Sequence, residues 1–337
     1  VIVMRRRQAG RMPAPTLPPA ARALALASLL AALALPAQAS LAGMAEPASS
    51  APARPWVIAH RGASAHRPEH TLAAYALAME QGADAIEPDL VMTRDGVLVA
   101  RHENELSDTT DVAQRPEFAA RKTRRQVDGS GVTGWFVEDF SLAELKTLRA
   151  RERLPQLRST QWDGLYDIPT FSEIIALAAA HAARTGRDVG LVPEIKHPSH
   201  FAALGLAMEQ PLLDALGAHD YTRRAPVLIQ SFEVGNLRAL REKIPRGGNV
   251  RLLQLLGSPG QSPHDAVRAG TRLTYAQMAA PEGLREIASY ADAVGPPFRS
   301  LQLKRKGDAY RSELVDAAHA SGLQVVAYTF RPENFFL

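Results

Sequence analysis

Residues 82–103 have the sequence GADAIEPDLVMTRDGVLVARHE, which holds two short apolar runs, 85–90 and 97–101. Few residues separate the runs, and Asp95-Gly96 supplies a turn between them. A crossover between parallel strands needs about a dozen residues or more, so this link is too short for one. We therefore predict an antiparallel hairpin, which brings the start of the first run close to the end of the second.

Short apolar runs alternate with longer segments of helical character along most of the remaining chain. The other expected strands are 56–59, 189–195, 227–230, 250–255, 291–294 and 323–328. The expected helices are 71–80, 170–184, 201–216, 234–243, 281–289 and 311–320. This alternation predicts an α/β fold with a parallel sheet or barrel.

Residues 103–167 interrupt the alternation, and we interpret them as an insertion that caps the face where the third strand ends. The insertion has several glycines and little regular periodicity. Its basic cluster consists of Arg121, Lys122, Arg124 and Arg125. We expect this cluster to form a solvated surface, and the alternative is that it guides an anionic substrate.

The N-terminal segment differs from the rest of the chain. Arginines precede an apolar run at 23–35, and the small-residue triplet Ala37-Gln38-Ala39 follows. A run of this length is too short to span a membrane, so we predict a signal peptide over 1–39, cleaved after Ala39, and a periplasmic or secreted protein. An unstructured lead-in over 40–55 is expected next.

Charge and cysteine content exclude two further possibilities. The predicted leader holds five of the 39 Lys and Arg residues and no acidic residue. The mature chain would therefore have 39 − 5 = 34 basic residues against 35 acidic residues, and would be nearly neutral. A nucleic-acid partner is therefore not expected. The chain has no cysteine, which excludes both disulfides and a lipoprotein anchor.

Polar and charged side chains recur where the expected strands end, the edge that carries the chemistry in parallel barrels. They are His60 and Arg61 after the first strand, Glu87 and Asp89 on the second, His102 after the third, Glu194 and Lys196 at the fourth, and Gln230 and Phe232 at the fifth.

The carboxylates predict a metal site. Glu87 and Asp89 are two positions apart, so they share one face of a strand, and Glu194 can lie beside them. Carboxylates gathered in a barrel repel one another unless a positive charge lies between them. Three carboxylates without cysteine favour Ca²⁺ or Mg²⁺ over zinc. The alternative is a set of ordinary surface acids paired with arginines.

The histidines and cations predict acid–base chemistry on a phosphate. His60 and His102 are candidates for a general base and a general acid. Arg61 and Lys196 can hold an anion, and together with a metal they suit cleavage of a phosphate ester. We assign little catalytic role to His66 and His70.

The chain resembles the glycerophosphodiester phosphodiesterases, especially the periplasmic type, from about residue 56 to its end. The stretches that carry the resemblance are AHRGASAHRPEHTLAAY (59–75), the hairpin stretch 82–103, PEIKHP (193–198), QSFE (230–233) and AYTFRPEN (327–334). The resemblance implies a TIM-type (β/α)8 barrel over 56–337 that hydrolyses glycerophosphodiesters to sn-glycerol 3-phosphate and an alcohol.

The resemblance also assigns roles to residues. It implies His60 and His102 as the acid/base pair, Glu87, Asp89 and Glu194 as metal ligands, and Arg61, Lys196, Glu69, Gln230 and Phe232 as substrate-binding residues. We expect His60 to start as the base, Gly62 to let the backbone pass beneath the ligand, and Ca²⁺ to be favoured over Mg²⁺.

Two features depart from the family pattern. Glu103 stands where an aspartate is common, which we expect to have little consequence. The sequence ends without the family's last helix and strand, so we expect the last β/α unit to be missing. Two alternatives remain: a phospholipase C- or D-like enzyme acting on membrane lipids, and a catalytically inactive secreted binding protein. The oligomeric state is not predicted.

Overall fold

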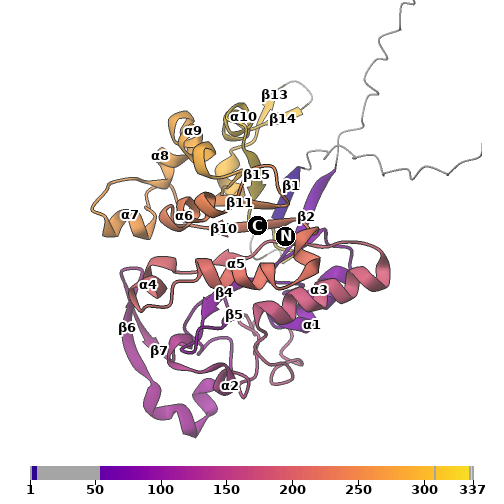
Figure 1. The fold of residues 1–337 in the computed structure, drawn as a ribbon, viewed down its shortest axis with the longest axis vertical. Coiled ribbons are helices and arrows are strands. Elements are labelled where there is room, and N and C mark those ends of the chain that lie inside the picture. The colour runs from indigo at the N-terminus through magenta and orange to yellow at the C-terminus, as the bar shows by residue number, and fades with distance from the viewer. Residues whose placement is uncertain (1, 6–53, 307–308, 334, 336–337) are drawn as a thin grey trace, which may run out of the picture. The chain divides into compact units, whose positions relative to one another are not determined.

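The computed structural model describes residues 2–5, 54–306, 309–333 and 335 (Figure 1). Residues 6–53, which include most of the predicted leader and lead-in, lie outside this range, and so does the predicted cleavage site at Ala39. None of the described helices is long and apolar enough to cross a membrane.

Seven strands form a curled parallel sheet whose members pair in chain order. They are β2 (Pro55–His60), β3 (Ala85–Glu87), β8 (Gly190–Leu191), β10 (Val227–Ser231), β11 (Val250–Leu255), β12 (Ala293–Gly295) and β15 (Gln324–Ala327). Among the described strands, β15 and β2 are linked through β1 (Ile2–Arg5), which is antiparallel to both. The α/β class and the curled parallel sheet are as predicted, but the parallel strands do not close on one another.

Two of these strands continue beyond a proline. After Pro88, β3 resumes as β4 (Asp89–Met92), and after Pro193, β8 resumes as β9 (Glu194–Ile195). Proline has no N–H to donate to the ladder, so the interruptions fall where donors are missing. The register is the same on both sides, because Ala85 pairs with Gly190 and Asp89 with Glu194.

The predicted hairpin is confirmed. β4 pairs antiparallel with β5 (Leu98–Ala100), with Leu90 opposite Ala100. The Arg101 N–H donates to the Asp89 carbonyl at 3.0 Å, so the end of the second hairpin strand lies beside the start of the first.

One face of the sheet carries a separate apolar cluster made of Ile58, Ala85, Val192, Leu228, Leu253, Leu255, Ala293 and Val326. Residues two apart on a strand point to the same face. Four predicted site residues lie two positions beyond a member of this cluster: His60 after Ile58, Glu87 after Ala85, Glu194 after Val192 and Gln230 after Leu228. The predicted site therefore follows the apolar cluster, one step nearer the carboxyl ends of the strands.

The helices flank the sheet, with α6, α9 and α10 beside one another and α1 against α3 (Figure 1). The α-helices are α1 (Leu72–Glu80), α2 (Leu142–Leu145), α3 (Phe171–Thr185), α4 (Pro198–Ala203), α5 (Glu209–Gly217), α6 (Gly235–Lys243), α7 (His264–Arg268), α8 (Tyr275–Ala279), α9 (Pro281–Tyr290) and α10 (Glu313–Ala320). Short 3-10 turns are η1 (Val112–Gln114), η2 (Pro116–Arg121), η3 (Val137–Asp139), η4 (Asp220–Arg223) and η5 (Phe298–Leu301). A small hairpin joins β13 (Lys304–Lys306) to β14 (Ala309–Arg311).

Local sequence signals explain where helices begin and end. Thr170 and Glu173 form a capping box at the start of α3, and Gly186 ends the helix at φ +70°. The single helix predicted over 201–216 is wrong, because the structure has α4 and α5 there. Gly205, at φ +76°, lies between them, and a left-handed residue does not continue a helix.

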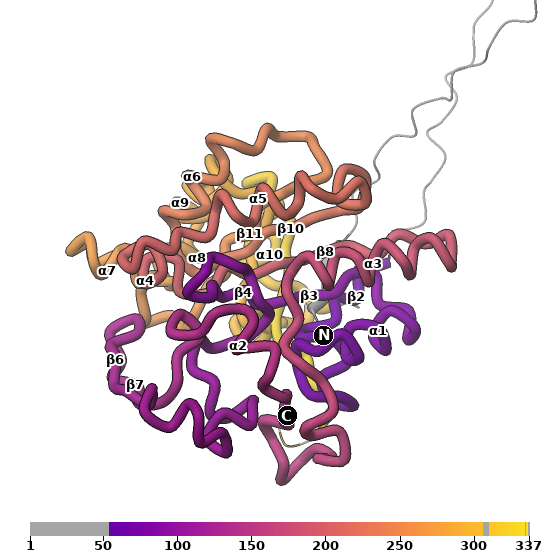
Figure 2. Tube along the Cα trace, turned by 60° about the horizontal axis from the view of Figure 1, so that its bottom comes forward, coloured from indigo at the N-terminus to yellow at the C-terminus, as the bar shows by residue number. Residues whose placement is uncertain are grey.

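The insertion has more structure than its composition predicted. β6 (Thr123–Val127) and β7 (Ser130–Gly134) form a hairpin around Asp128-Gly129, whose positive φ angles of 47° and 79° are typical of a type I′ turn. Figures 1 and 2 both show this hairpin at the outer edge of the elements that they draw. Phe118, Trp135 and Phe140 of the insertion are buried and belong to the same apolar core as residues of the sheet and the flanking helices.

Two members of the basic cluster, Arg121 and Arg125, have side chains that are 31% and 28% exposed and are paired within the insertion. Arg121 hydrogen-bonds to Glu144 and lies over the Phe118 ring at 5.1 Å. Arg125 forms an ion pair with Glu138 at 3.2 Å. These arginines tie the insertion together, because their charges are paired within it, whereas Lys122 and Arg124 are exposed.

Candidate active site

Three buried carboxylates meet at the carboxyl ends of neighbouring strands. Glu87, Asp89 and Glu194 each offer an oxygen within 4.8 Å of the others, and each residue is at most 6% exposed. Asp89 and Glu194 are paired in register on β4 and β9, and Gln230 on β10 continues the same row. The sheet brings together the three residues that the sequence predicted as metal ligands.

The electrostatics of this trio are those of an under-neutralised cluster. Burial and the charges of Asp89 and Glu194 raise the pKa of Glu87 well above its usual value. Burial also raises the pKa of Glu194 to about 8, although Lys196 opposes the shift. Burial acts in the same direction on Asp89, but Lys196 and two histidines outweigh it and hold its pKa well below the usual value.

Surrounding donors fix the orientation of the carboxylates. The Gln230 side-chain amide donates to Glu87 Oε1 at 2.9 Å, and the Arg61 backbone N–H donates to Glu87 Oε2 at 2.9 Å. Lys196 Nζ lies 2.8 Å from Glu194 Oε1. Asp89 Oδ1 is buried without a hydrogen-bond partner, so one oxygen remains for a cation.

His70 belongs to the site, although the sequence gave it little weight. Its side chain is fully buried, with Nε2 2.8 Å from Asp89 Oδ2 and Nδ1 2.7 Å from the Tyr75 hydroxyl. Burial lowers the pKa of His70, which favours the neutral ring. A neutral His70 that donates from Nε2 can accept from Tyr75 at Nδ1, and so orients the Asp89 carboxylate.

His60 and His102 approach the site from different strands. His60 ends β2 and is paired in register with Glu87. Burial and the neighbouring Arg61 lower the pKa of His60 well below its usual value. Burial, Lys196 and Arg61 lower the pKa of His102 to about 4, and its Nδ1 hydrogen-bonds to Glu103. Both rings are therefore neutral near pH 7 and able to accept a proton.

Arg61 is held in an uncommon backbone conformation, at φ +60°. Its Nη1 donates to the Glu69 carboxylate at 3.1 and 3.3 Å, and its Nε lies 3.6 Å from Asp89 Oδ2. Glu69 therefore braces Arg61. A Cβ added at Gly62 would lie 2.7 Å from the Ala74 backbone, so this glycine permits close packing of the turn on α1.

Two cavities include parts of this residue set. One, of about 570 Å³, is lined by His60, Arg61 and Glu69, among others. Another, of about 520 Å³, is lined by Glu194, Lys196 and Phe232, among others. These hollows give solvent and small molecules access to both sides of the predicted set.

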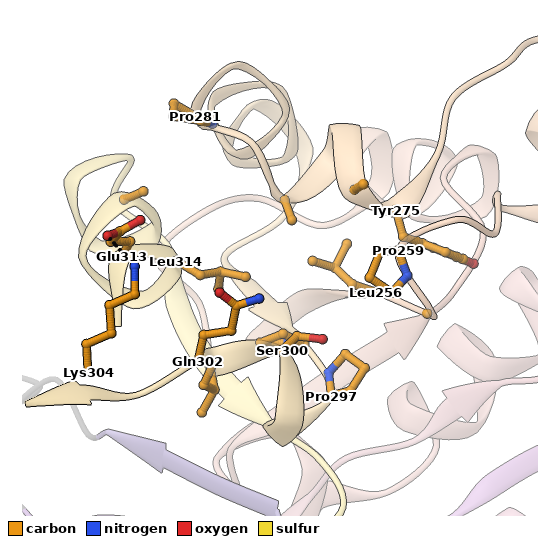
Figure 3. A pocket seen from close by; sticks show the side chains of 16 residues that line it. Leu256, Pro259, Tyr275, Pro281, Pro297, Ser300, Gln302, Lys304, Glu313 and Leu314 are labelled. Carbon is orange, nitrogen blue, oxygen red and sulfur yellow. Dashed lines mark hydrogen bonds and ion pairs between the residues drawn. The ribbon is translucent and has the colours of Figure 1, made fainter. Parts of the chain in front are cut away.

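A further cavity, of about 410 Å³, lies among α8, α9, α10 and η5 (Figure 3). Leu256, Pro259, Pro297 and Leu314 contribute to its mostly apolar wall. Its charged lining residues, Lys304 and Glu313, are paired with each other at 3.0 Å. It contains none of the predicted site residues and is not a candidate active site.

Comparison with known proteins agrees with this geometry. A model of the glycerophosphoryl diester phosphodiesterase family matches residues 60–334. A glycerophosphodiester phosphodiesterase of Arabidopsis thaliana is 36% identical over 306 residues, covering 84% of this chain and 76% of that protein. One from Haemophilus influenzae is 30% identical over 296 residues, covering 82% and 79%.

The fold agrees as well. The crystal structure of a Silicibacter pomeroyi protein, named for the same family, matches with a TM-score of 0.58 and 25% identity over 82% of each chain. With the family model covering most of the residues that form the sheet and the site, this chain belongs to the glycerophosphoryl diester phosphodiesterase family.

Proposed function

We propose that this chain hydrolyses glycerophosphodiesters to sn-glycerol 3-phosphate and an alcohol, and that hydrolysis depends on a divalent cation. The observation that carries the proposal is the buried trio of Glu87, Asp89 and Glu194 within reach of two histidines and two cationic side chains. The names of the curated relatives, at 30% and 36% identity, support the same activity.

The residues present fit a hard divalent cation. The donors are carboxylate oxygens, their charges are under-neutralised, and Asp89 Oδ1 has no other partner. Glu87, Asp89 and Glu194 would hold the ion, with Ca²⁺ favoured and Mg²⁺ as the alternative. When bound, the cation supplies positive charge that stabilises the phosphoryl oxygens as negative charge develops on them.

The remaining residues position phosphate and move protons. Arg61 and Lys196 hold phosphate oxygens, while His60 takes the proton from the attacking hydroxyl. If that hydroxyl belongs to water, sn-glycerol 3-phosphate forms directly; if it belongs to the substrate's own glycerol, a cyclic phosphate forms and water then opens it to the same product. His102 gives a proton to the leaving alcohol oxygen. The positive charges of Lys196 and Arg61 help to lower the pKa of His102, so an anionic phosphodiester between them raises it and prepares His102 as the acid.

The test is an assay of the purified chain against glycerophosphocholine with Ca²⁺ or Mg²⁺, with and without a chelator. We expect activity that the chelator removes and that His60→Ala and Glu87→Ala abolish. His319→Ala, at an exposed position on α10, is the control histidine variant. Turnover that survives either site substitution would refute the assignment.

We also propose that the protein is exported, as in the periplasmic type of this family, with the leader over 1–39 removed and the lead-in over 40–55 left before the enzyme. The support is the sequence pattern of arginines, apolar run and small residues. N-terminal sequencing of protein recovered from the periplasm or medium tests this. We expect a terminus at Ser40, and an intact leader on the exported protein would contradict it.

A further inference from the structure

A single arginine from the insertion contacts the carboxylates that hold two different parts of the site. Arg153 Nη2 donates to Glu69 Oε1 at 2.7 Å, and its Nε donates to Glu69 Oε2 at 3.0 Å. The same Nη2 also donates to Glu103 Oε2. The planar guanidinium thus forms a bidentate contact with Glu69 through Nε and Nη2, and Nη2 also donates to Glu103.

Each of these carboxylates holds a residue that the proposed function uses. Glu69 accepts from Arg61 Nη1, and Glu103 hydrogen-bonds to His102 Nδ1. The contacts form one continuous chain in the order Arg61, Glu69, Arg153, Glu103, His102. The phosphate-holding arginine and one proton-transfer histidine are therefore tied through Arg153.

Burial and charge make Arg153 the part of this chain that is hardest to replace. Glu69 is only 4% exposed, so losing one of its two cationic partners leaves a poorly compensated buried charge. The Glu103 side chain is 38% exposed and is free to turn toward solvent once Arg153 is gone. A Glu103 that turns away releases Nδ1 of His102, and the ring then loses both its orientation and its fixed tautomer.

Building on the function proposed above, we propose that Arg153 is a positioning residue: it holds Glu69 and Glu103 so that Arg61 keeps its place and His102 keeps its proton on Nδ1, leaving Nε2 for proton transfer. The insertion therefore contributes a positioning side chain to the site. Glu103, which stands where the family commonly has an aspartate, is the link through which Arg153 acts on His102.

The experiment compares Arg153→Gln and Arg153→Lys with the wild-type chain in the glycerophosphocholine assay. We expect Arg153→Gln to lower kcat by about 10- to 100-fold, because small displacements of catalytic groups have effects of this size. KM for the substrate should change less than kcat, the pH profile should shift, and Arg153→Lys should recover part of the loss. Added guanidinium ion should partly restore Arg153→Gln.

Arg151→Gln is the matched control, because Arg151 lies in the same segment, is 42% exposed and pairs with Asp163 at 3.6 Å. We expect it to keep wild-type kcat. A double variant, Arg153→Gln with Glu103→Gln, should lose no more than about the larger single loss, because both substitutions break the same chain of contacts. Additive losses, or an Arg153→Gln kcat within about twofold of wild type, would overturn the proposal.

Nitrogen NMR of the His102 ring supplies a readout that does not require turnover. The wild-type ring should be the Nδ1-protonated tautomer, and Arg153→Gln should give a mixture of the two neutral tautomers. A wild-type chain without turnover would refute the proposed function, and the tautomer comparison would still decide the role of Arg153. An unchanged tautomer in Arg153→Gln refutes that role.

Discussion

Replacing Gly62 by alanine tests why the turn after His60 and Arg61 has its shape. Gly62 has φ +81°, and an added Cβ would lie 2.7 Å from the Ala74 carbonyl carbon in the backbone of α1. The left-handed backbone costs an L-residue about 1–2 kcal/mol, and overpacking against atoms that cannot give way adds about 1–3 kcal/mol. We expect Gly62→Ala to lower the free energy of unfolding by about 2–5 kcal/mol.

Gly82→Ala separates the two contributions. Gly82 also has a left-handed backbone, at φ +88°, but an added Cβ would meet nothing within 4 Å. We expect this variant to lose only the conformational part, about 1–2 kcal/mol. Urea unfolding of both variants, followed by circular dichroism in the presence of chelator, measures the difference. Equal losses would show that contact with α1 does not constrain the turn.

Three further predictions concern the carboxylates. His70→Phe should weaken Ca²⁺ affinity by about 10- to 100-fold by releasing Asp89, as calorimetry would show; unchanged affinity would contradict the orienting role. Metal affinity should rise with pH up to about 8, the raised pKa of Glu194, because the ligand must lose its proton first; flat affinity between pH 6 and 8 would count against this. The hydrogen bond from Arg121 lowers the pKa of Glu144 to about 2, so its stabilising effect should be present above about pH 4.5 and fade toward pH 2; acid unfolding of Glu144→Gln should lack this component.

The sequence predicted the parts of the site that depend on strand periodicity. Glu87, Asp89 and Glu194 were found because alternate residues of a strand share a face and parallel strands end at one edge. The same reasoning placed His102 through the short hairpin link. These inferences needed only the spacing of residues along a strand or across a short turn, and secondary structure fixes the geometry of such neighbours.

The residues that the sequence missed act through contacts that spacing does not encode. His70 reaches Asp89 from a left-handed position at φ +57°, which no helix or strand period predicts. Arg153 meets Glu69 across 84 positions of sequence, from a segment without regular structure. The pairing of Arg121 with Glu144 was also missed, because a basic cluster looks the same in sequence whether or not its charges are paired.

Several strands of the sheet carry core-packing residues first and site residues two positions later. Ile58, Ala85 and Leu228 fill the face of the sheet with apolar side chains, and two positions later the same face carries polar groups. Burying carboxylates there opposes folding: the pKa of Glu194 in the folded chain, about 8, lies above its ordinary value of 4.5, so the metal-free fold loses stability as pH rises between them. A bound cation removes that loss by favouring the ionised form, whereas burial of the apolar positions upstream stabilises the sheet independently of the cation.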